Sequence, residues 1–221
     1  MAGKISIGRT LDAWTHRGHA VVRLELYVEG GGDAKALRGR CREGFRRFLE
    51  HAGLRGHMPR IVACGGRDSA YEDFKTALGQ GRSAMLLVDS EAPVIAGAPW
   101  AHLAARDAWA PPPGATDSQC HLMVECMESW FLADRATLQS FFGQGFKVAA
   151  LPADARPIES IPKAEVYQSL ASATKDCKTK ARYGKGEHSF DLLGRIEPAK
   201  VTVASPWADR FVSDLKKAMH A

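Results

Sequence analysis

Acidic side chains stand beside glycine or serine in two short segments of the chain. In the segment LELYVEGGGD, Glu29 follows an apolar run, and three glycines separate it from Asp33. In the segment SAMLLVDSE, a second apolar run ends on Asp89 and Glu91. Carboxylate oxygens are the ligands that Mg²⁺ prefers. These acids could therefore hold divalent cations, and two such ions can clamp the attacking and leaving oxygens of a phosphodiester.

Two further acids, Glu125 and Glu128, lie in the segment HLMVECMESWFLAD, which we expect to pass from a strand into a helix. Their separation of three residues then places both on one face of that helix. The face could point towards the other acids or towards solvent, and we expect solvent for Glu125.

The remaining acids differ in how readily a structural role explains them. Asp33 is also a suitable N-cap for the helix that follows it, and Glu91 could be an exposed loop acid. Glu29 and Asp89 stand directly after buried strands, where a charge needs a partner or a function. These two residues are therefore the strongest candidates.

The glycines do not match the common phosphate-binding templates. No G-K-[ST] follows them as in a Walker A loop, and Lys35 occupies the third glycine position of a G-x-G-x-x-G pattern. The chain also contains no G-x-S-x-G elbow and no H-E-x-x-H motif, so hydrolysis by a serine triad or a zincin is unsupported. The glycines instead predict a tight turn that lets a substrate backbone approach.

Strands and helices alternate over the first half of the chain. The predicted strands are 21–28, 60–63 and 84–88, and the predicted helices between them are 33–53 and 69–81, the second with Ser69 as its N-cap. This alternation predicts an α/β fold with a mainly parallel, Rossmann-like sheet flanked by helices. In such a sheet ligands bind outside the carboxyl ends of the strands, so we expect all six acids near one crevice.

The last third of the chain is predicted to be mostly helical. Helices are expected there at 163–174, 188–196 and 205–219, and a further short helix is expected earlier, at 99–109, in the loop after the third strand. We therefore expect one domain over 1–221, with a core of about 20–135 and a helical C-terminal extension of about 160–221.

The net charge of +5 is unevenly distributed over the 221 residues. Basic residues gather at 38–47 and at 175–186. For the first cluster, a solvated face and a partner-binding face are equally open interpretations. The second is rich in glycine and poor in apolar residues. We expect it to be a loop that offers Lys178, Lys180 and Arg182 to an acidic partner such as nucleic acid.

The cysteines and the hydropathy of the chain indicate its cellular compartment. Five scattered cysteines without a C-x-x-C pair are typical of reduced thiols in the core of a cytosolic protein. No apolar stretch approaches the roughly 20 residues that cross a bilayer, and the first residues lack the apolar stretch of a signal peptide. We therefore expect a cytoplasmic protein with no membrane partner.

At the acidic segments the chain resembles the Toprim family, the metal-dependent domain of topoisomerases, primases and OLD-type nucleases. The family pattern is an apolar strand that ends in Glu-Gly and a later strand that ends in Asp-x-Asp. LYVEGGGD and LLVDSE match it, except that Glu91 replaces the second Asp. LLVDSEAPV, HLMVECMESWFLAD and YGKGEHSFDLL further resemble a bacterial family of unknown function within this group. Some of its relatives are thought to work beside AAA ATPases in phage defence.

The resemblance implies a Toprim fold, two Mg²⁺ or Mn²⁺ ions, and roles for individual residues. The implied metal ligands are Glu29, Asp33, Asp89, Glu91 and Glu128, with Asp33 in the place of an acid of the OLD-type variant. Glu29 could instead be the general acid or base, and Glu128 would complete a second metal site. A basic residue near the phosphate is also implied, for which Lys163 and Lys185 are the candidates.

Together these features predict a metal-dependent nuclease that acts on DNA phosphodiesters, with phage defence and an AAA ATPase partner as the extended expectation. The alternative is a Toprim-like module that binds nucleic acid or a partner ATPase without cutting. Nucleotidyl transfer ranks last, because no separate nucleotide-binding motif is present. Topoisomerase activity is disfavoured, because we expect Tyr183 of the basic loop to be a surface or packing residue.

Overall fold

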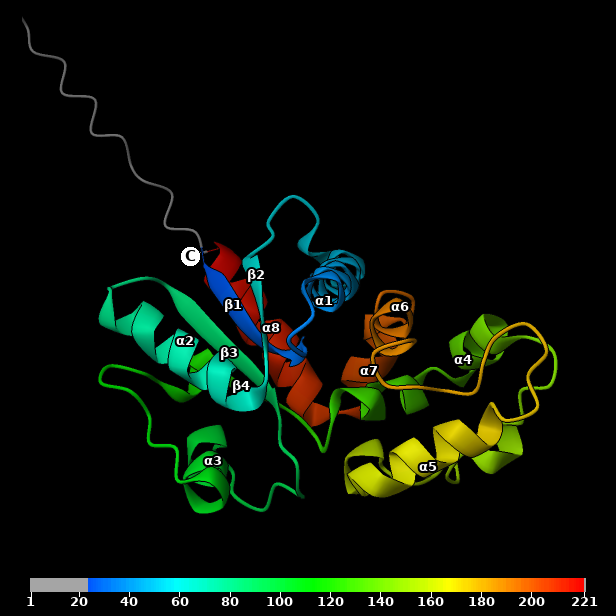
Figure 1. The fold of residues 1–221 in the computed structure, drawn as a ribbon. Helices are drawn as coiled ribbons and strands as arrows, with labels where there is room; N and C mark the ends of the chain where they lie inside the picture. The colour runs from blue at the N-terminus through cyan, green and yellow to red at the C-terminus, as the bar shows by residue number, and fades with distance from the viewer. Residues whose placement is uncertain (1–23, 221) are drawn as a thin grey trace, which may run out of the picture.

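The computed structural model describes residues 24–220, which build a four-stranded sheet (Figure 1). The strands are β1 (Glu25–Gly31), β2 (Arg60–Gly65), β3 (Ala84–Asp89) and β4 (Cys120–Met123). All pairings are parallel, in the order β2-β1-β3-β4. Because parallel strands share one direction, their four carboxyl ends meet at the same edge of the sheet.

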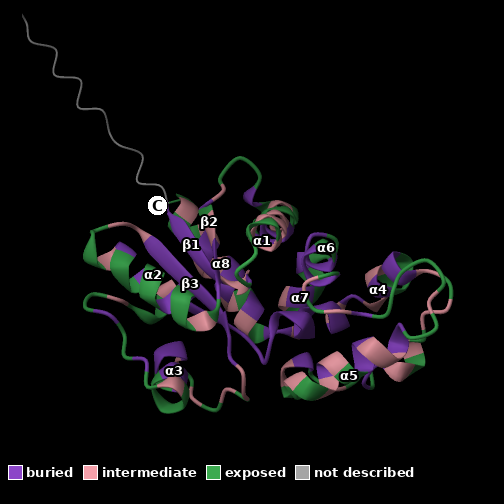
Figure 2. Ribbon diagram, viewed as in Figure 1, coloured by how far each residue is buried: buried purple, intermediate pink, exposed green. Residues whose placement is uncertain are grey.

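Helices cover both faces of the sheet, and Figure 2 shows the strands largely buried. The helices are α1 (Lys35–Leu49), α2 (Arg67–Gly79), α3 (Pro99–Asp107), α4 (Arg135–Phe142), α5 (Lys163–Ala173), α6 (Ser189–Leu193), α7 (Pro198–Ala204) and α8 (Pro206–His220). Successive side chains of a strand point to opposite faces. Leu26 and Leu87 pack in one cluster with side chains of α1 and α8, whereas Tyr27 and Leu86 pack in a second with side chains of α2 and α3.

Shorter helical turns connect these elements. They are the π-type turn Glu50–Leu54 and the 3₁₀ turns Asp117–Gln119, Met127–Ala133, Val148–Ala150 and Ile158–Ser160. In Figure 1 the segment between α5 and α6 runs past α4 before it reaches α6.

The predicted α/β class, the parallel sheet and the mostly helical last third are confirmed. Two predicted helix starts are wrong. The helix α2 begins two residues before Ser69, which is therefore not its N-cap. Ala34, not Asp33, occupies the N-cap position of α1. Residues 21–23 of the first predicted strand lie outside the described residues.

Two predictions from composition can also be compared with the structure. The cysteines are free thiols, and four are buried, as expected of core residues: Cys41, Cys64, Cys120 and Cys126. Over residues 24–220, every helix is too short or too polar to cross a membrane.

The first strand continues through the glycines instead of ending at Glu29. Gly30 and Gly31 both lie opposite Gly65 of β2, which makes a bulge at the end of the strand pair. Gly31 has a φ of +92°, and a Cβ on it would lie 2.7 Å from the backbone Cα of Arg38. Glycine is therefore required for β1 and α1 to pack this closely beside Glu29.

This packing predicts different costs for alanine at neighbouring glycines. Gly32 also has a positive φ, of +48°, but nothing lies within 4 Å of a Cβ there. Gly32→Ala should cost about 1–2 kcal/mol through its left-handed backbone, which lowers the melting temperature (Tm) by about 2–8 °C. Gly31→Ala should lower Tm further, because the same backbone cost adds to a clash with α1. Equal Tm values in thermal melts would contradict this packing.

Candidate functional site

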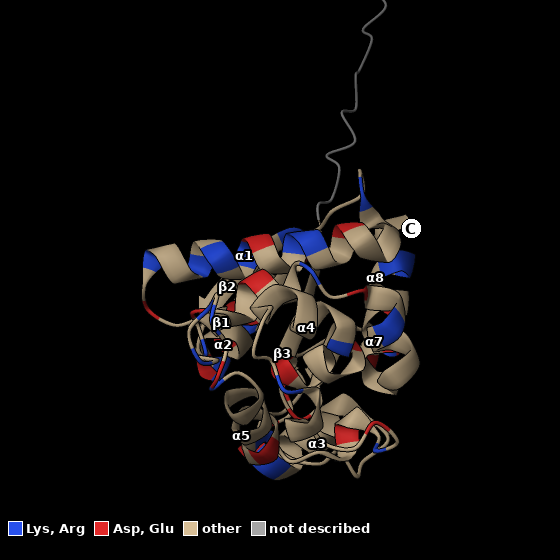
Figure 3. Ribbon diagram, turned by 90° about the vertical axis from the view of Figure 1, so that its right-hand side faces the viewer, with Lys and Arg blue, Asp and Glu red and all other residues tan. Residues whose placement is uncertain are grey.

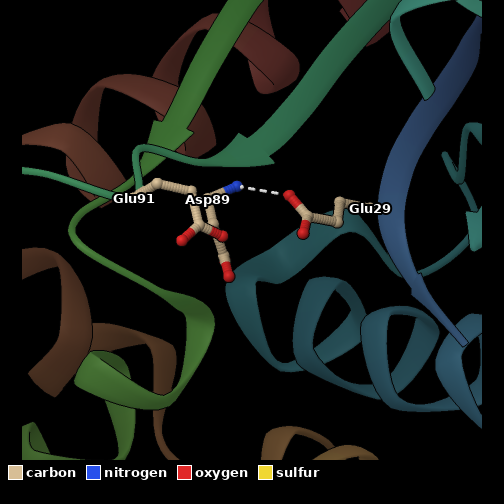
Figure 4. A group of neighbouring side chains, drawn as sticks. All are labelled: Glu29, Asp89 and Glu91. Atoms are coloured by element: carbon tan, nitrogen blue, oxygen red, sulfur yellow. Dashed lines mark hydrogen bonds between the residues drawn. The ribbon is translucent and has the colours of Figure 1, made fainter. Parts of the chain in front are cut away.

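Three of the predicted acids lie together at the carboxyl edge of the sheet. Glu29, Asp89 and Glu91 each offer a carboxylate oxygen, and these oxygens lie within 4.8 Å of one another. Oε2 of Glu29 accepts a hydrogen bond from the backbone N–H of Asp89 at 3.0 Å (Figure 4). The bulged end of β1 and the end of β3 therefore bring acids 60 residues apart in sequence into one group.

A lysine from the C-terminal third neutralises part of this group. Nζ of Lys163, the first residue of α5, lies 3.1 Å from Oδ2 of Asp89 and also donates a hydrogen bond to Oε1 of Glu91. The backbone N–H of Lys163 donates to Oε2 of Glu125 at 2.8 Å. Lys163, predicted as a phosphate-binding residue, thus lies among the acids themselves.

Burial shifts the protonation of these acids. Burial, with the neighbouring charge of Asp89, raises the pKa of Glu29. Burial, with the charge of Glu128, raises the pKa of Asp89 against the opposing effect of Lys163. Burial also acts to raise the pKa of Glu91, but the hydrogen bond from Lys163 and the nearby positive charges together outweigh it, and the pKa is lowered. The chain alone therefore leaves the negative charge of Glu29 and Asp89 incompletely balanced.

The backbone at Glu91 is unusual for its residue type. Its φ is +63°, in the left-handed region that residues other than glycine rarely occupy. The backbone N–H of Glu91 donates to the carbonyl oxygen of Glu125 at 2.9 Å, which holds this conformation. Such conformations cluster at functional sites. The turn directs the carboxylate of Glu91 back towards Asp89 and Lys163.

Arg67, at the start of α2, is a second cation that the sequence did not single out. One of its nitrogens lies 3.9 Å from Oε2 of Glu29 and also donates to the carbonyl oxygen of Asp89. Its other terminal nitrogen donates to Asp107 at 2.6 Å, and the guanidinium lies 4.8 Å from the ring centroid of Trp109. Its position directly after the two glycines at the end of β2 could have identified Arg67 as a site residue from the sequence.

Glu128 is held by hydroxyl groups beside the same site. It is 1% exposed and accepts hydrogen bonds from Tyr167 at 2.8 Å, from Tyr183 at 3.2 Å and from Ser189 at 3.1 Å. Tyr183 is therefore a packing residue, one of the two roles expected for it, and it also makes a polar contact. Neither Tyr167 nor Ser189 was predicted, because their contacts come from helices remote in sequence.

The prediction for Glu125 was wrong. Its side chain does not face solvent: the residue is 5% exposed and caps the start of α5 through Lys163. The shared helix face is also wrong, because the 3₁₀ turn begins at Met127 and Glu125 precedes it in a bend. The short strand β4 ends at Met123, and this leaves Glu125 in the connection, where it turns towards α5.

The glycines, the acids and α6 enclose a pocket of about 330 Å³, which we call the acidic pocket. Its walls include Glu29, Asp89 and Glu128, with Lys185 and Ser189 on the side of α6. Nζ of Lys185 lies 5.5 Å from the ring centroid of Tyr167. Lys185 is thus the cation of the basic loop that the structure brings to this pocket.

Other predicted residues lie elsewhere. Asp33 is fully exposed, outside the group of three acids, and it pairs with Arg38 at 3.7 Å. Lys178 and Arg182 are exposed on the segment between α5 and α6, where Nε of Arg182 donates to a carbonyl oxygen of α5. Lys180 lines a different pocket. The basic loop therefore divides its cations among several places.

Comparison with known proteins identifies the chain only at the level of a domain. Residues 28–216 match the model of a family described as a domain of unknown function, DUF4276. No curated protein and no solved structure matches the chain. The matched range contains every acid and every lysine discussed above.

The raised carboxyl pKa values predict a pH-dependent stability. The folded protein holds protons on Glu29 and Asp89 that the unfolded chain releases once pH exceeds about 4. Its stability should therefore be fully present below that pH and fall as pH rises through the raised pKa values. Glu29→Gln removes one of these carboxyls, so its Tm advantage over wild type in EDTA should grow with pH.

Thermal melts between about pH 4 and pH 8 check this expectation. Glu72→Gln is the matched control, because Glu72 is exposed on α2 and, among the described residues, pairs only with Lys75. A Tm difference between wild type and Glu29→Gln that stays constant over this pH range would contradict the raised pKa.

Proposed function

The chain belongs to the DUF4276 family, and we propose that it is a divalent-metal-dependent nuclease that hydrolyses DNA phosphodiesters. One observation carries the proposal: three carboxylates meet within 4.8 Å beside a glycine-walled pocket at the carboxyl edge of a parallel sheet. The order of the motifs, Glu29 first and Asp89-Ser90-Glu91 later, supports it through the resemblance to Toprim enzymes.

The donor set fits a hard divalent cation. Glu29, Asp89 and Glu91 present oxygen ligands only, as Mg²⁺ and Mn²⁺ prefer. The raised pKa of Glu29 and of Asp89 shows that the chain does not fully balance their charge. When bound at these acids, such an ion would polarise a phosphoryl oxygen and lower the pKa of water.

Glu29 is placed to handle the proton of the attacking water. Its Oε2 is engaged by the backbone N–H of Asp89, so Oε1 is the oxygen that can accept a proton in the pocket. A base works best when its pKa lies near the operating pH, and burial raises the pKa of Glu29 in that direction. A nitrogen of Arg67 lies 3.9 Å from the same Oε2 and leaves Oε1 free of that contact.

Neighbouring groups orient the acids and the substrate. The backbone N–H of Met127 donates to Oδ1 of Asp89 at 2.9 Å, which fixes the side chain of this buried acid. Lys185 brings a positive charge to the pocket wall, where it can bind a phosphate oxygen. The wall from Gly30 to Gly32 lacks side chains, so a phosphate backbone can approach the acids closely.

A binding module that does not cut is the second candidate. The observation in its favour is that Lys163 already supplies a cation to Asp89 and Glu91. A lysine in this place could neutralise the acids permanently, and the pocket would then hold nucleic acid without hydrolysing it.

Asp89→Asn tests the proposed site. The substitution keeps the shape and removes the charge that would hold the ion, which is worth several kcal/mol. Cleavage of plasmid DNA with Mn²⁺ should fall by about a hundredfold or more. Wild type should gain Tm with Mn²⁺, because a ligand bound only by the folded state stabilises it, and Asp89→Asn should lose most of that gain.

Two variants control this comparison. Asp154→Asn makes the same change at an exposed acid and should cleave like wild type. Glu91→Asp restores the Asp-x-Asp pattern and should keep or raise activity. Full cleavage and an unchanged Mn²⁺ gain in Asp89→Asn would show that the metal lies elsewhere.

Lys163→Met separates the two candidate functions. Without its ammonium, Asp89 and Glu91 lose their counter-charge, so Tm without metal should fall. In a nuclease, wild type already gains Tm with Mn²⁺, and the gain should be larger in Lys163→Met. A gain seen only in Lys163→Met, together with no cleavage by wild type, would favour the binding module.

A further inference from the structure

A second pocket, of about 570 Å³, lies between α4, the basic loop and the end of α6. We call it the basic pocket. Its walls include Ser140 and Phe141 of α4, Lys180 of the loop, Arg195 beyond α6, and His51 from the turn after α1. Among residues 24–220, no aspartate or glutamate lines it.

Two cations share one aromatic ring in this pocket. Nζ of Lys180 lies 4.4 Å and Cζ of Arg195 lies 5.5 Å from the ring centroid of Phe141, which is 9% exposed. Within residues 24–220, neither cation has a salt-bridge partner. Two like charges that line one pocket repel each other unless an anion offsets their charge. The pocket is therefore complementary to an anion.

The basic residues of α1 are arranged differently. Arg46 pairs with Glu43 and Glu50, and Arg47 pairs with Glu43. Figure 3 shows acidic residues interspersed with the basic ones along α1. Arg46 and Arg47 are thus paired with nearby acids, whereas Lys180 and Arg195 are not paired within residues 24–220.

The basic pocket lies one short helix away from the acidic pocket. Ser189 and Phe190, at the start of α6, line the acidic pocket, and Gly194 and Arg195, just past its end, line the basic pocket. Five helical residues span about 7.5 Å. A nucleic-acid strand a few nucleotides long can therefore reach from one pocket to the other.

We propose that the basic pocket binds a backbone phosphate of a nucleic-acid strand, within a few nucleotides of the phosphate that occupies the acidic pocket. This proposal rests on the proposed function, and it makes the substrate a strand rather than a mononucleotide. Arg195 offers a planar fork of donors and Lys180 a compact charge, the two side chains that most often bind phosphate.

The test uses the full chain with Lys180 and Arg195 both changed to glutamine. Binding of a labelled single-stranded oligonucleotide is measured by fluorescence anisotropy in EDTA, over a series of salt concentrations. The double variant should bind several-fold more weakly at low salt. The slope of log affinity against log salt should become shallower by about 1.4, which is about 0.7 for each of two lost contacts.

The matched control changes Arg55 and Lys217 to glutamine. Lys217 lines a groove with Ala84 at the start of β3, and Arg55 precedes β2, so both lie at the edge of the sheet opposite the site. The control removes the same net charge and should keep the wild-type slope. An equal slope in Lys180→Gln/Arg195→Gln and in the control would overturn the proposal, provided that melts show both variants folded.

Two further measurements separate the alternatives. If the basic pocket served a free phosphate or a nucleotide, wild type would bind inorganic phosphate or deoxyadenosine monophosphate as tightly as the strand, and the double variant would lose that binding. This outcome would overturn the assignment to a strand. Cleavage with Mn²⁺ is measured separately. If wild type never cuts but the double variant has a shallower salt slope, the proposed nuclease function is contradicted and the proposed phosphate binding in the basic pocket is supported.

Discussion

Three carboxylates at the end of a buried parallel sheet repel one another, and the surrounding structure is organised around that repulsion. Asp89 is the centre of the problem, because it is 4% exposed and stands between Glu29 and Glu91. Water cannot screen its charge there, so the chain must supply hydrogen-bond donors or cations. Met127 supplies a backbone N–H and Lys163 an ammonium group.

The groups that offset this repulsion come from the part of the chain outside the sheet. Lys163 and Tyr167 lie four residues apart on α5, and they contact Asp89 and Glu128 respectively. Ser189 of α6 completes the contacts of Glu128. The helical last third is therefore part of the site. A sheet with the same strands but without α5 and α6 would present bare acids to solvent.

Sequence patterns predicted the parallel sheet and the meeting of Glu29, Asp89 and Glu91, because strand positions and strand ends follow from local hydropathy. They could not predict the partners of these acids. Lys163 reaches Asp89 across 74 residues, and nothing in its own neighbourhood marks the contact. Glu125 was misplaced for a related reason. A bend, not a helix, follows the short β4, so the helical spacing assumed for Glu125 and Glu128 did not apply.

The distance in sequence between the acids and their cation also orders events during synthesis. Translation adds about 5–20 residues per second, so the roughly 40 residues from Met123 to Lys163 take a few seconds to appear after the last strand. Throughout that interval the nascent sheet has no ammonium group for Asp89. The strands must pair with their acids protonated or hydrated, and the edge closes only when α5 leaves the ribosome.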